Sequence, residues 1–233
     1  ASGSSLRLHY GQALLHLGRA DEAMTHFENY YQARGKTPED AQKIADQLFN
    51  FRYLDRAESY LDRMFDAESA DLIQKAFLKL VETYQHTGRN DEISGLVTQF
   101  LNDTPNPAKG RQVAVSVLER HGLYGQAAEQ ISRIREFQGN VMGFDLGVNL
   151  FRAGRTDQAR QAFREHADNS PYAGAVWMKI ANFYRNHARP DLARRAFDRA
   201  VESAPDDAKV RETRGRFRLD QGEVEAGLED FEA

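Results

Sequence analysis

Two lysines have a spacing that suits the binding of an anion. Lys75 and Lys79 stand four residues apart, so a helix would carry both ammonium groups on one face. Two such groups could together receive a carboxylate or a phosphate from a partner. The alternative is a solvated helix face that binds no ligand.

Histidine is the other residue type that could bind a metal or act as a general base. Of the seven histidines, His86, His121 and His187 recur at the same kind of turn, one or two repeat periods apart, which is too far to share a metal. The sequence contains no HExxH, P-loop, GxGxxG or nucleophile-elbow motif. We therefore predict that the chain is not an enzyme and has no catalytic residue, no metal site and no cofactor.

The composition is that of a soluble, folded chain with little net charge. The 233 residues include 31 Lys and Arg against 35 Asp and Glu, a formal charge of −4. This balance gives no overall attraction to nucleic acids, and no apolar run approaches the ~20 residues of a membrane helix. We expect no nucleic-acid partner and no direct membrane insertion. The absence of cysteine fits an exported protein or a bacterial cytosolic one, and between these we favour the periplasm.

Arginine is in excess, with 24 Arg against 7 Lys. Because a guanidinium binds phosphate in a bidentate way, single-stranded RNA binding by a helical solenoid is one alternative function, and it would weaken steeply with salt. The arginines are dispersed among acidic residues, as in Arg155/Asp157 and Asp198/Arg199. This pattern favours solvated pairs along helix faces.

The whole chain shows one internal period. An anchor residue, usually Gly, is followed five positions later by a small residue, usually Ala, and nine positions later by a bulky apolar residue. The anchors are Gly18, Arg52, Gly88, Gly122, Gly154, Ala188 and Gly222, at successive spacings of 34, 36, 34, 32, 34 and 34 residues. Seven copies at one period require a shared structural unit.

Each period predicts two helices. In the unit around Ala188, apolar residues fall at helical spacing on both sides of the anchor, for example Trp177 and Tyr184 before it and Phe197 after it. Prolines are expected to end second helices at 105, 171 and 205 and to begin helices at 38 and 190. We predict a series of helical hairpins and essentially no strand.

The sixth unit is the best copy, and its pattern resembles the tetratricopeptide repeat (TPR) family. Its signature positions hold Trp177, Ile180, Ala181, Tyr184, Ala193, Phe197, Ala200 and Pro205. The resemblance covers residues 4 to 233 and implies an all-α, right-handed TPR-type solenoid of about seven helix–turn–helix repeats. We expect a linker or cloning scar at 1–5 and units at about 6–37, 38–69, 70–105, 106–138, 139–171, 172–205 and 206–233. We interpret the chain as a fragment of a larger bacterial protein.

The resemblance also implies a binding surface. In TPR proteins the first helix of each pair lines a concave groove that binds peptides or partner domains. The groove positions fall here on Gln42, Lys43, Asp46, Lys75, Lys79, Glu82, Lys109, Gln112, Ser116, Lys179, Asn182 and Arg185. The carboxylate clamp of some family members is incomplete, because Leu8, Gln12 and Lys43 stand where Lys, Asn and Asn would be.

The function implied is a non-catalytic protein–protein interaction scaffold. One alternative is the periplasmic TPR region of a bacterial exopolysaccharide export or assembly protein, with polysaccharide as a possible partner; the other is the RNA-binding solenoid. We also expect self-association through the C-terminal face, because Leu228 and Phe231 have no following repeat to cover them.

Two local features leave alternatives open. In the seventh unit, Arg211, Arg214 and Arg218 occupy positions that are apolar in the better copies. We expect a degenerate repeat that uses Val210, Phe217 and Leu219 for its core; the alternative is a basic binding face. At the turn of the second unit, inter-repeat core is favoured over an exposed aromatic anchor for Phe49, Phe51, Tyr53 and Phe65.

Overall fold

The protein is all-α. The computed structural model describes residues 2–139 and 141–232, and side chains for 5–139 and 141–232. Within these ranges there are fourteen α-helices, one short 3-10 helix (η1) and no strand. The helices are α1 (Ser2–His16), α2 (Ala20–Ala33), α3 (Pro38–Asn50), α4 (Leu54–Asp62), α5 (Ala70–His86), η1 (Asn90–Glu92), α6 (Ile93–Asp103), α7 (Pro107–Arg120), α8 (Tyr124–Gln138), α9 (Gly143–Arg152), α10 (Thr156–Asp168), α11 (Ala173–Asn186), α12 (Pro190–Ser203), α13 (Ala208–Asp220) and α14 (Val224–Glu232).

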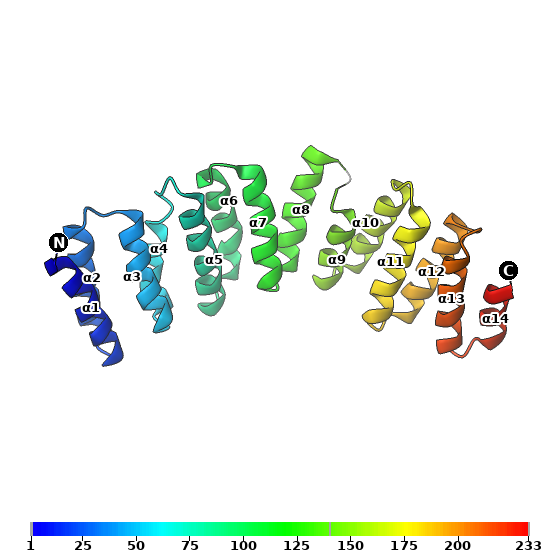
Figure 1. Cartoon of the computed structure of the whole chain (residues 1–233), viewed down its shortest axis with the longest axis horizontal. Coiled ribbons are helices and arrows are strands. Elements are labelled where there is room, and N and C mark those ends of the chain that lie inside the picture. The colour runs from blue at the N-terminus through cyan, green and yellow to red at the C-terminus, as the bar shows by residue number, and fades with distance from the viewer. Residues whose placement is uncertain (1, 140, 233) are drawn as a thin grey trace. The chain divides into compact units, whose positions relative to one another are not determined.

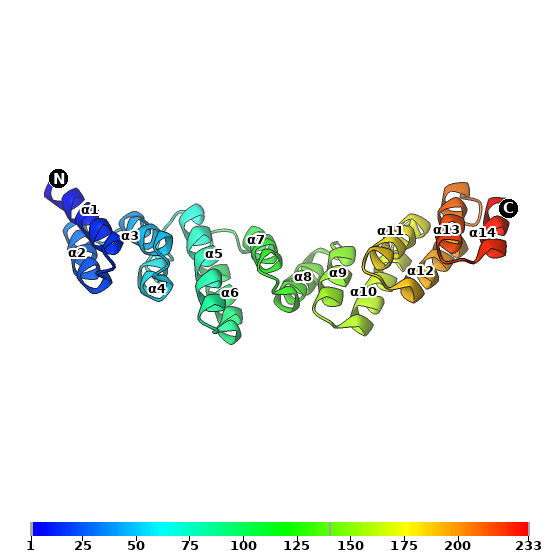
Figure 2. The same ribbon diagram turned by 90° about the horizontal axis from the view of Figure 1, so that it is seen from below.

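The helices form two compact units, one up to Gln130 and the other from Ile131 onward. Inside each unit, consecutive helices pair as hairpins, and both ribbon views show the two members of a pair side by side (Figures 1 and 2). First helices of neighbouring hairpins also touch: α3 contacts α1 and α5, α5 contacts α7, and in the second unit α11 contacts α13. The expected all-α TPR-type repeat architecture is therefore confirmed.

The N-terminal residues differ from expectation. We expected residues 1–5 to be a linker, but α1 begins at Ser2, so residues 2–5 are helical. Ala1 lies outside the described residues. The helix continues from these residues into the first repeat without a break.

The seven anchors of the sequence period are the turn residues of the seven hairpins. All seven have positive φ, including the two that are not glycine, Arg52 at 61° and Ala188 at 53°. After each anchor, the next backbone N–H donates to the carbonyl five residues earlier, at 2.8–3.0 Å. This 6→1 hydrogen bond needs a left-handed residue before its donor, which explains the preference for glycine.

The other two positions of the period build the core. Five residues after each anchor lies a fully buried residue, Ala193 and Ala23 among them. Nine residues after it lies a buried large side chain, such as Phe27, Phe163 or Phe197. The seventh copy is the exception, because Phe231 is 44% exposed.

Prolines stand where the sequence predicts them. Pro38 begins α3 and Pro190 begins α12, where a missing N–H leaves no hydrogen bond unmade. Pro105, Pro171 and Pro205 each follow the end of a second helix. In the part of the chain that is described, no helix is long and apolar enough to cross a membrane.

The seventh hairpin corrects one expectation. Val210 and Phe217 are buried as predicted, but Leu219 is 38% exposed and contributes little to the core. Arg214 and Arg218 are mostly buried instead, and each binds the carboxylates of Asp198 and Asp230. Neither expected alternative describes these two arginines, because they form an internal ion-pair network rather than a wet or ligand-binding face.

Candidate functional site

The predicted groove residues lie on the first helices of their hairpins. In the first unit, α3 carries three of them, α5 three and α7 three, and these helices touch in that order. In the second unit, α11 carries Lys179, Asn182 and Arg185. Nine of the twelve predicted residues therefore lie in the first unit, and the other three lie in the second.

Residues on α3 and α5 meet through ion pairs. The Lys79 ammonium pairs with Asp46 and lies 4.7 Å from the ring centroid of Phe49. Beside it, Arg52 Nη1 donates to Glu82 Oε1 at 2.8 Å. Three of the predicted groove residues are therefore already engaged in contacts between two neighbouring hairpins.

Lys75 and Lys79 do not turn toward a common point. Lys75 Nζ lies 2.7 Å from Asp71 Oδ2, one turn earlier on α5, and about half of the Lys75 side chain is exposed. Lys79 instead reaches across to α3. Each ammonium therefore already has a carboxylate of this chain beside it.

Lys43 belongs to a buried network around Asp40. The Asp40 carboxylate is 2% exposed and accepts hydrogen bonds from Tyr30 Oη at 2.6 Å and Lys43 Nζ at 2.8 Å. Burial opposes ionisation, but these bonds and one from Thr37 outweigh it and lower the pKa of Asp40 to about 2. Since Tyr30 comes from α2 and Asp40 from α3, the network ties the first hairpin to the second.

The remaining predicted residues divide between free and engaged side chains, and Gln42 on α3 and Arg185 on α11 are among those without a partner in the described chain. Among the described residues, Lys109, Gln112 and Ser116 are exposed on α7, and their side chains make no hydrogen bond or ion pair. In the second unit, Lys179 Nζ lies 3.8 Å from the ring centroid of Phe144, and Asn182 Nδ2 donates to a backbone carbonyl of α11. The α7 face is thus the freest part of the predicted surface.

The aromatic residues at the second turn are part of the core. Phe65 is buried, and Phe49, Phe51 and Tyr53 are partly buried against the same hydrophobic cluster. The ring of Phe51 also packs edge-on against the ring of His16, with 4.5 Å between the two ring centroids. These contacts fit inter-repeat packing rather than an exposed anchor.

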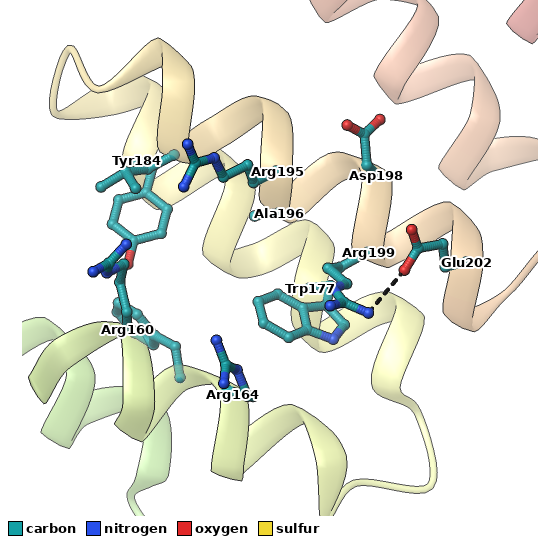
Figure 3. A pocket seen from close by; sticks show the side chains of 11 residues that line it. Arg160, Arg164, Trp177, Tyr184, Arg195, Ala196, Asp198, Arg199 and Glu202 are labelled. Carbon is teal, nitrogen blue, oxygen red and sulfur yellow. Dashed lines mark hydrogen bonds and ion pairs between the residues drawn. The ribbon is translucent and has the colours of Figure 1, made fainter. Parts of the chain in front are cut away.

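A pocket of about 400 Å³ lies in the second unit between α10, α11 and α12. Figure 3 shows arginines from α10 and α12 around the indole of Trp177 from α11. The lining residues are Arg160, Phe163, Arg164, Trp177, Tyr184, Leu192, Arg195, Ala196, Asp198, Arg199 and Glu202. The pocket opens beside second helices, not on the first-helix face that the sequence analysis singled out.

The arginines of this pocket differ in their partners. Arg160 pairs with Asp157 and Arg199 with Glu202, each three residues away on the same helix and well exposed. Arg164 and Arg195 have no hydrogen-bond or ion-pair partner among the described residues. The pocket therefore holds two uncompensated guanidinium groups.

Tyr184 supplies a buried hydroxyl at one end of the pocket. Its side chain is 3% exposed, and within the described residues its Oη has no hydrogen-bond partner. Burial raises the pKa of Tyr184 to about 12, against the opposing charges of Arg160 and Arg189. The hydroxyl is therefore neutral at physiological pH and can donate to an acceptor.

Residues 150–217 match the tetratricopeptide repeat family. The matched segment runs from the end of α9 into α13 and contains the pocket and both of its hairpin turns. The family match thus covers this segment of the second unit. TPR proteins generally bind protein or peptide partners, so the architecture supports a protein-interaction scaffold.

Several solved structures are similar to this chain. A MamA double mutant is 14% identical and covers 68% of this chain and 90% of its own, with a TM-score of 0.40. YrrB, described as a TPR protein with an unusual peptide-binding site, is 17% identical over 79% of this chain and 95% of its own, at 0.38. PilF of Pseudomonas aeruginosa is 12% identical over 92% and 98%, also at 0.38. At these scores none of them assigns a partner or a site to this chain, and no curated protein matches the sequence.

Sequence reasoning missed this pocket. The arginines were interpreted as dispersed members of solvated pairs, which holds for Arg160 and Arg199 but not for their neighbours. One signal was available: Arg160 and Arg164 repeat at i,i+4 on one second helix, and Arg195 and Arg199 do so on the next. Two such pairs flanking the chain's one tryptophan could have indicated a basic, aromatic site.

Proposed function

We propose that this protein is a non-catalytic scaffold that binds a partner peptide or domain on the first helices of its first unit. The observation that carries the proposal is the free face of α7. Lys109, Gln112 and Ser116 present an ammonium, an amide and a hydroxyl to solvent, with no partner among the described side chains. Such groups can bind a peptide without first breaking internal contacts.

The neighbouring helix extends this face. α5 touches α7, and its exposed Lys75 is held only by a pair with Asp71 on the same helix. An exposed pair of this kind contributes only about 0.3–0.5 kcal/mol, so a partner carboxylate could replace it at small cost. Lys79 is a poorer candidate, because it contacts both Asp46 and Phe49.

Affinity capture from source-cell lysate on the immobilised protein, with and without nuclease, tests the proposal. We expect a defined, nuclease-resistant protein to be retained. Reversing charge in Lys75→Glu together with Lys109→Glu should abolish retention, whereas Lys209→Glu, an exposed reversal on α13, should leave it unchanged. Equal retention by both variants would refute the first-helix site.

The same experiment separates the two alternative functions. Recovery of only nuclease-sensitive material would favour the RNA-binding alternative, and its affinity should then fall steeply with salt. Recovery of polysaccharide would favour a role in exopolysaccharide export or assembly, in the periplasm. Retention of one protein partner that survives nuclease would exclude RNA binding as the main function.

A further inference from the structure

We propose that the pocket between α10, α11 and α12 is a second binding site, which takes a carboxylate group of an acidic peptide. Arg164 and Arg195 hold the carboxylate, and Trp177 packs against the apolar atoms beside it (Figure 3). Both arginines lie on second helices of the second unit, and Trp177 lies on the first helix between them in sequence, α11. The failure or success of this site is therefore independent of the first-helix surface of the first unit.

Two unpaired cations face the pocket. Arg164 comes from α10 and Arg195 from α12, so two separate helices bring unpaired guanidinium groups to one pocket. Neither group has a carboxylate partner among the described residues. A guanidinium presents a planar fork of donors that matches a carboxylate, and such charge-assisted bonds are stronger than neutral ones.

The acids near the pocket are engaged by other arginines. Asp198 accepts from Arg214 at 3.1 Å and from Arg218 at 3.2 Å, both on α13. Glu202 is paired with Arg199 at 3.0 Å. The pocket thus keeps a positive excess, although the whole chain carries a formal charge of −4.

The buried hydroxyl of Tyr184 has no hydrogen-bond partner within the described residues. The tyrosine ring stands between the core and the pocket and meets the rings of Phe151 and Phe163 edge-on, and its hydroxyl end is turned toward Arg160 (Figure 3). A buried donor without an acceptor is costly, and few are found in folded proteins. An oxygen atom of a bound carboxylate would supply the missing acceptor.

The indole of Trp177 argues for a peptide rather than a free anion. It is partly exposed and lies in the middle of the pocket among the arginines (Figure 3). An aromatic face beside a cation suits a ligand that has both apolar and anionic parts. The volume of about 400 Å³ lies in the range of small-ligand pockets and is sufficient for one or two side chains.

Trp177 also provides the assay, because the protein contains one tryptophan. We would titrate the full chain with a C-terminally amidated peptide rich in Asp and Glu and follow tryptophan emission. A matched peptide with Asn and Gln is the ligand control, and the unamidated acidic peptide separates terminal from side-chain carboxylates. We expect a saturable change with the acidic peptides only, weakened by added salt.

Three variants locate the binding. Arg164→Ala and Arg195→Ala should each weaken the acidic peptide by roughly tenfold or more, since each removes a charge-assisted contact. Tyr184→Phe should weaken it less, by a few-fold. Arg133→Ala, at an exposed position on α8 outside the pocket, is the matched control and should bind like the unaltered chain. Circular dichroism and thermal unfolding check that every variant is folded.

Each remaining outcome counts against the proposal. Equal responses to the acidic and neutral peptides, or unchanged affinity in both arginine variants, would refute a carboxylate site. Tighter binding of inorganic phosphate or of single-stranded RNA than of the acidic peptide would also overturn it, because the pocket would then recognise phosphate.

Discussion

Arginines at two places in the second unit have opposite surroundings. Arg214 and Arg218 on α13 are mostly buried and share two carboxylates, Asp198 and Asp230. Arg164, only a few helices earlier, lines an open pocket and has no partner in the described part of the chain. The residue type is the same in both places, so its role is decided by whether a carboxylate of the same chain reaches it.

The comparison also explains why the seventh repeat tolerates arginine in its core. Two guanidinium groups facing two carboxylates leave little uncompensated charge, which is the condition for burying ions without a large penalty. The Asp230 side chain is 3% exposed and binds both arginines. In the pocket Arg164 and Arg195 are exposed and solvated, so they need no carboxylate of the chain, and a ligand carboxylate could bind them without displacing one.

Removing the shared acid should have the largest effect. Asp230→Ala leaves two mostly buried arginines with one carboxylate, so we expect the free energy of unfolding to fall by about 3 kcal/mol. Denaturant unfolding measures this. Glu212→Ala, which breaks an exposed pair with Arg216 on the same helix, is the control and should change stability by less than about 0.5 kcal/mol. A similar small loss for Asp230→Ala would contradict the difference between the two places.

The first unit also contains a buried, compensated carboxylate, and its contribution to stability depends on pH. Asp40 is a buried, bonded carboxylate whose pKa is lowered to about 2 from an ordinary 3.8. A lowered pKa contributes stability above the ordinary value, and this contribution, about 2 kcal/mol, is lost as the pH falls from about 4 to about 2. Unfolding free energies measured across that interval should therefore fall more steeply for the unaltered protein than for Asp40→Asn. Parallel curves would mean that Asp40 is not specially stabilised.

The buried hydroxyl of the pocket should give an effect of the opposite sign. Tyr184→Phe removes a donor that has no acceptor among the described residues, so we expect the free energy of unfolding to rise by about 1 kcal/mol. Thermal or denaturant unfolding without ligand measures it. A loss of stability would show that the hydroxyl already has a partner. The Tyr184 hydroxyl would then no longer support a carboxylate in the pocket.

The smallest effect on stability is expected at the unpaired cations. Arg164→Ala and Arg195→Ala each remove a charge that contacts no carboxylate of the chain, so each should change the unfolding free energy by no more than about 0.5 kcal/mol. The difference between these small changes and the loss expected for Asp230→Ala distinguishes an exposed, unpaired arginine from a buried, paired one. A loss of 2 kcal/mol or so in either variant would indicate a structural role instead of a binding role.

A further prediction concerns self-association through the apolar residues of the C-terminal face. Leu228 is 50% exposed and Phe231 is 44% exposed, so about half of each apolar side chain faces solvent. We expect concentration-dependent self-association, which light scattering would detect. A monomeric mass at high concentration, unchanged by Leu228→Ser, would refute it.

Much of the architecture could be predicted from the sequence because it depends on short-range rules. The anchors at one period, such as Gly18 and Gly154, mark turns because a left-handed residue and a 6→1 hydrogen bond are local requirements. The small and bulky residues five and nine positions later mark the buried face of a helix by its own periodicity. The order of helices and the TPR resemblance follow from these features.

The sites were less predictable because they depend on which side chains meet. The sequence places Lys75 and Lys79 on one helix face but does not show that Asp46, more than thirty residues earlier, pairs with one of them. It identifies costly arginines in the seventh repeat but not the acids that compensate them.

The sequence by itself therefore determined the repeat, its turns and its buried positions, all of which act within about ten residues along the chain. Only the tertiary structure decided which charges are compensated. Arg214 meets Asp230 sixteen residues away, and the pocket around Trp177 needs three helices from two hairpins. The physical reason is that the free energy of a buried charge depends on partners brought to it by packing, and no local pattern specifies those partners.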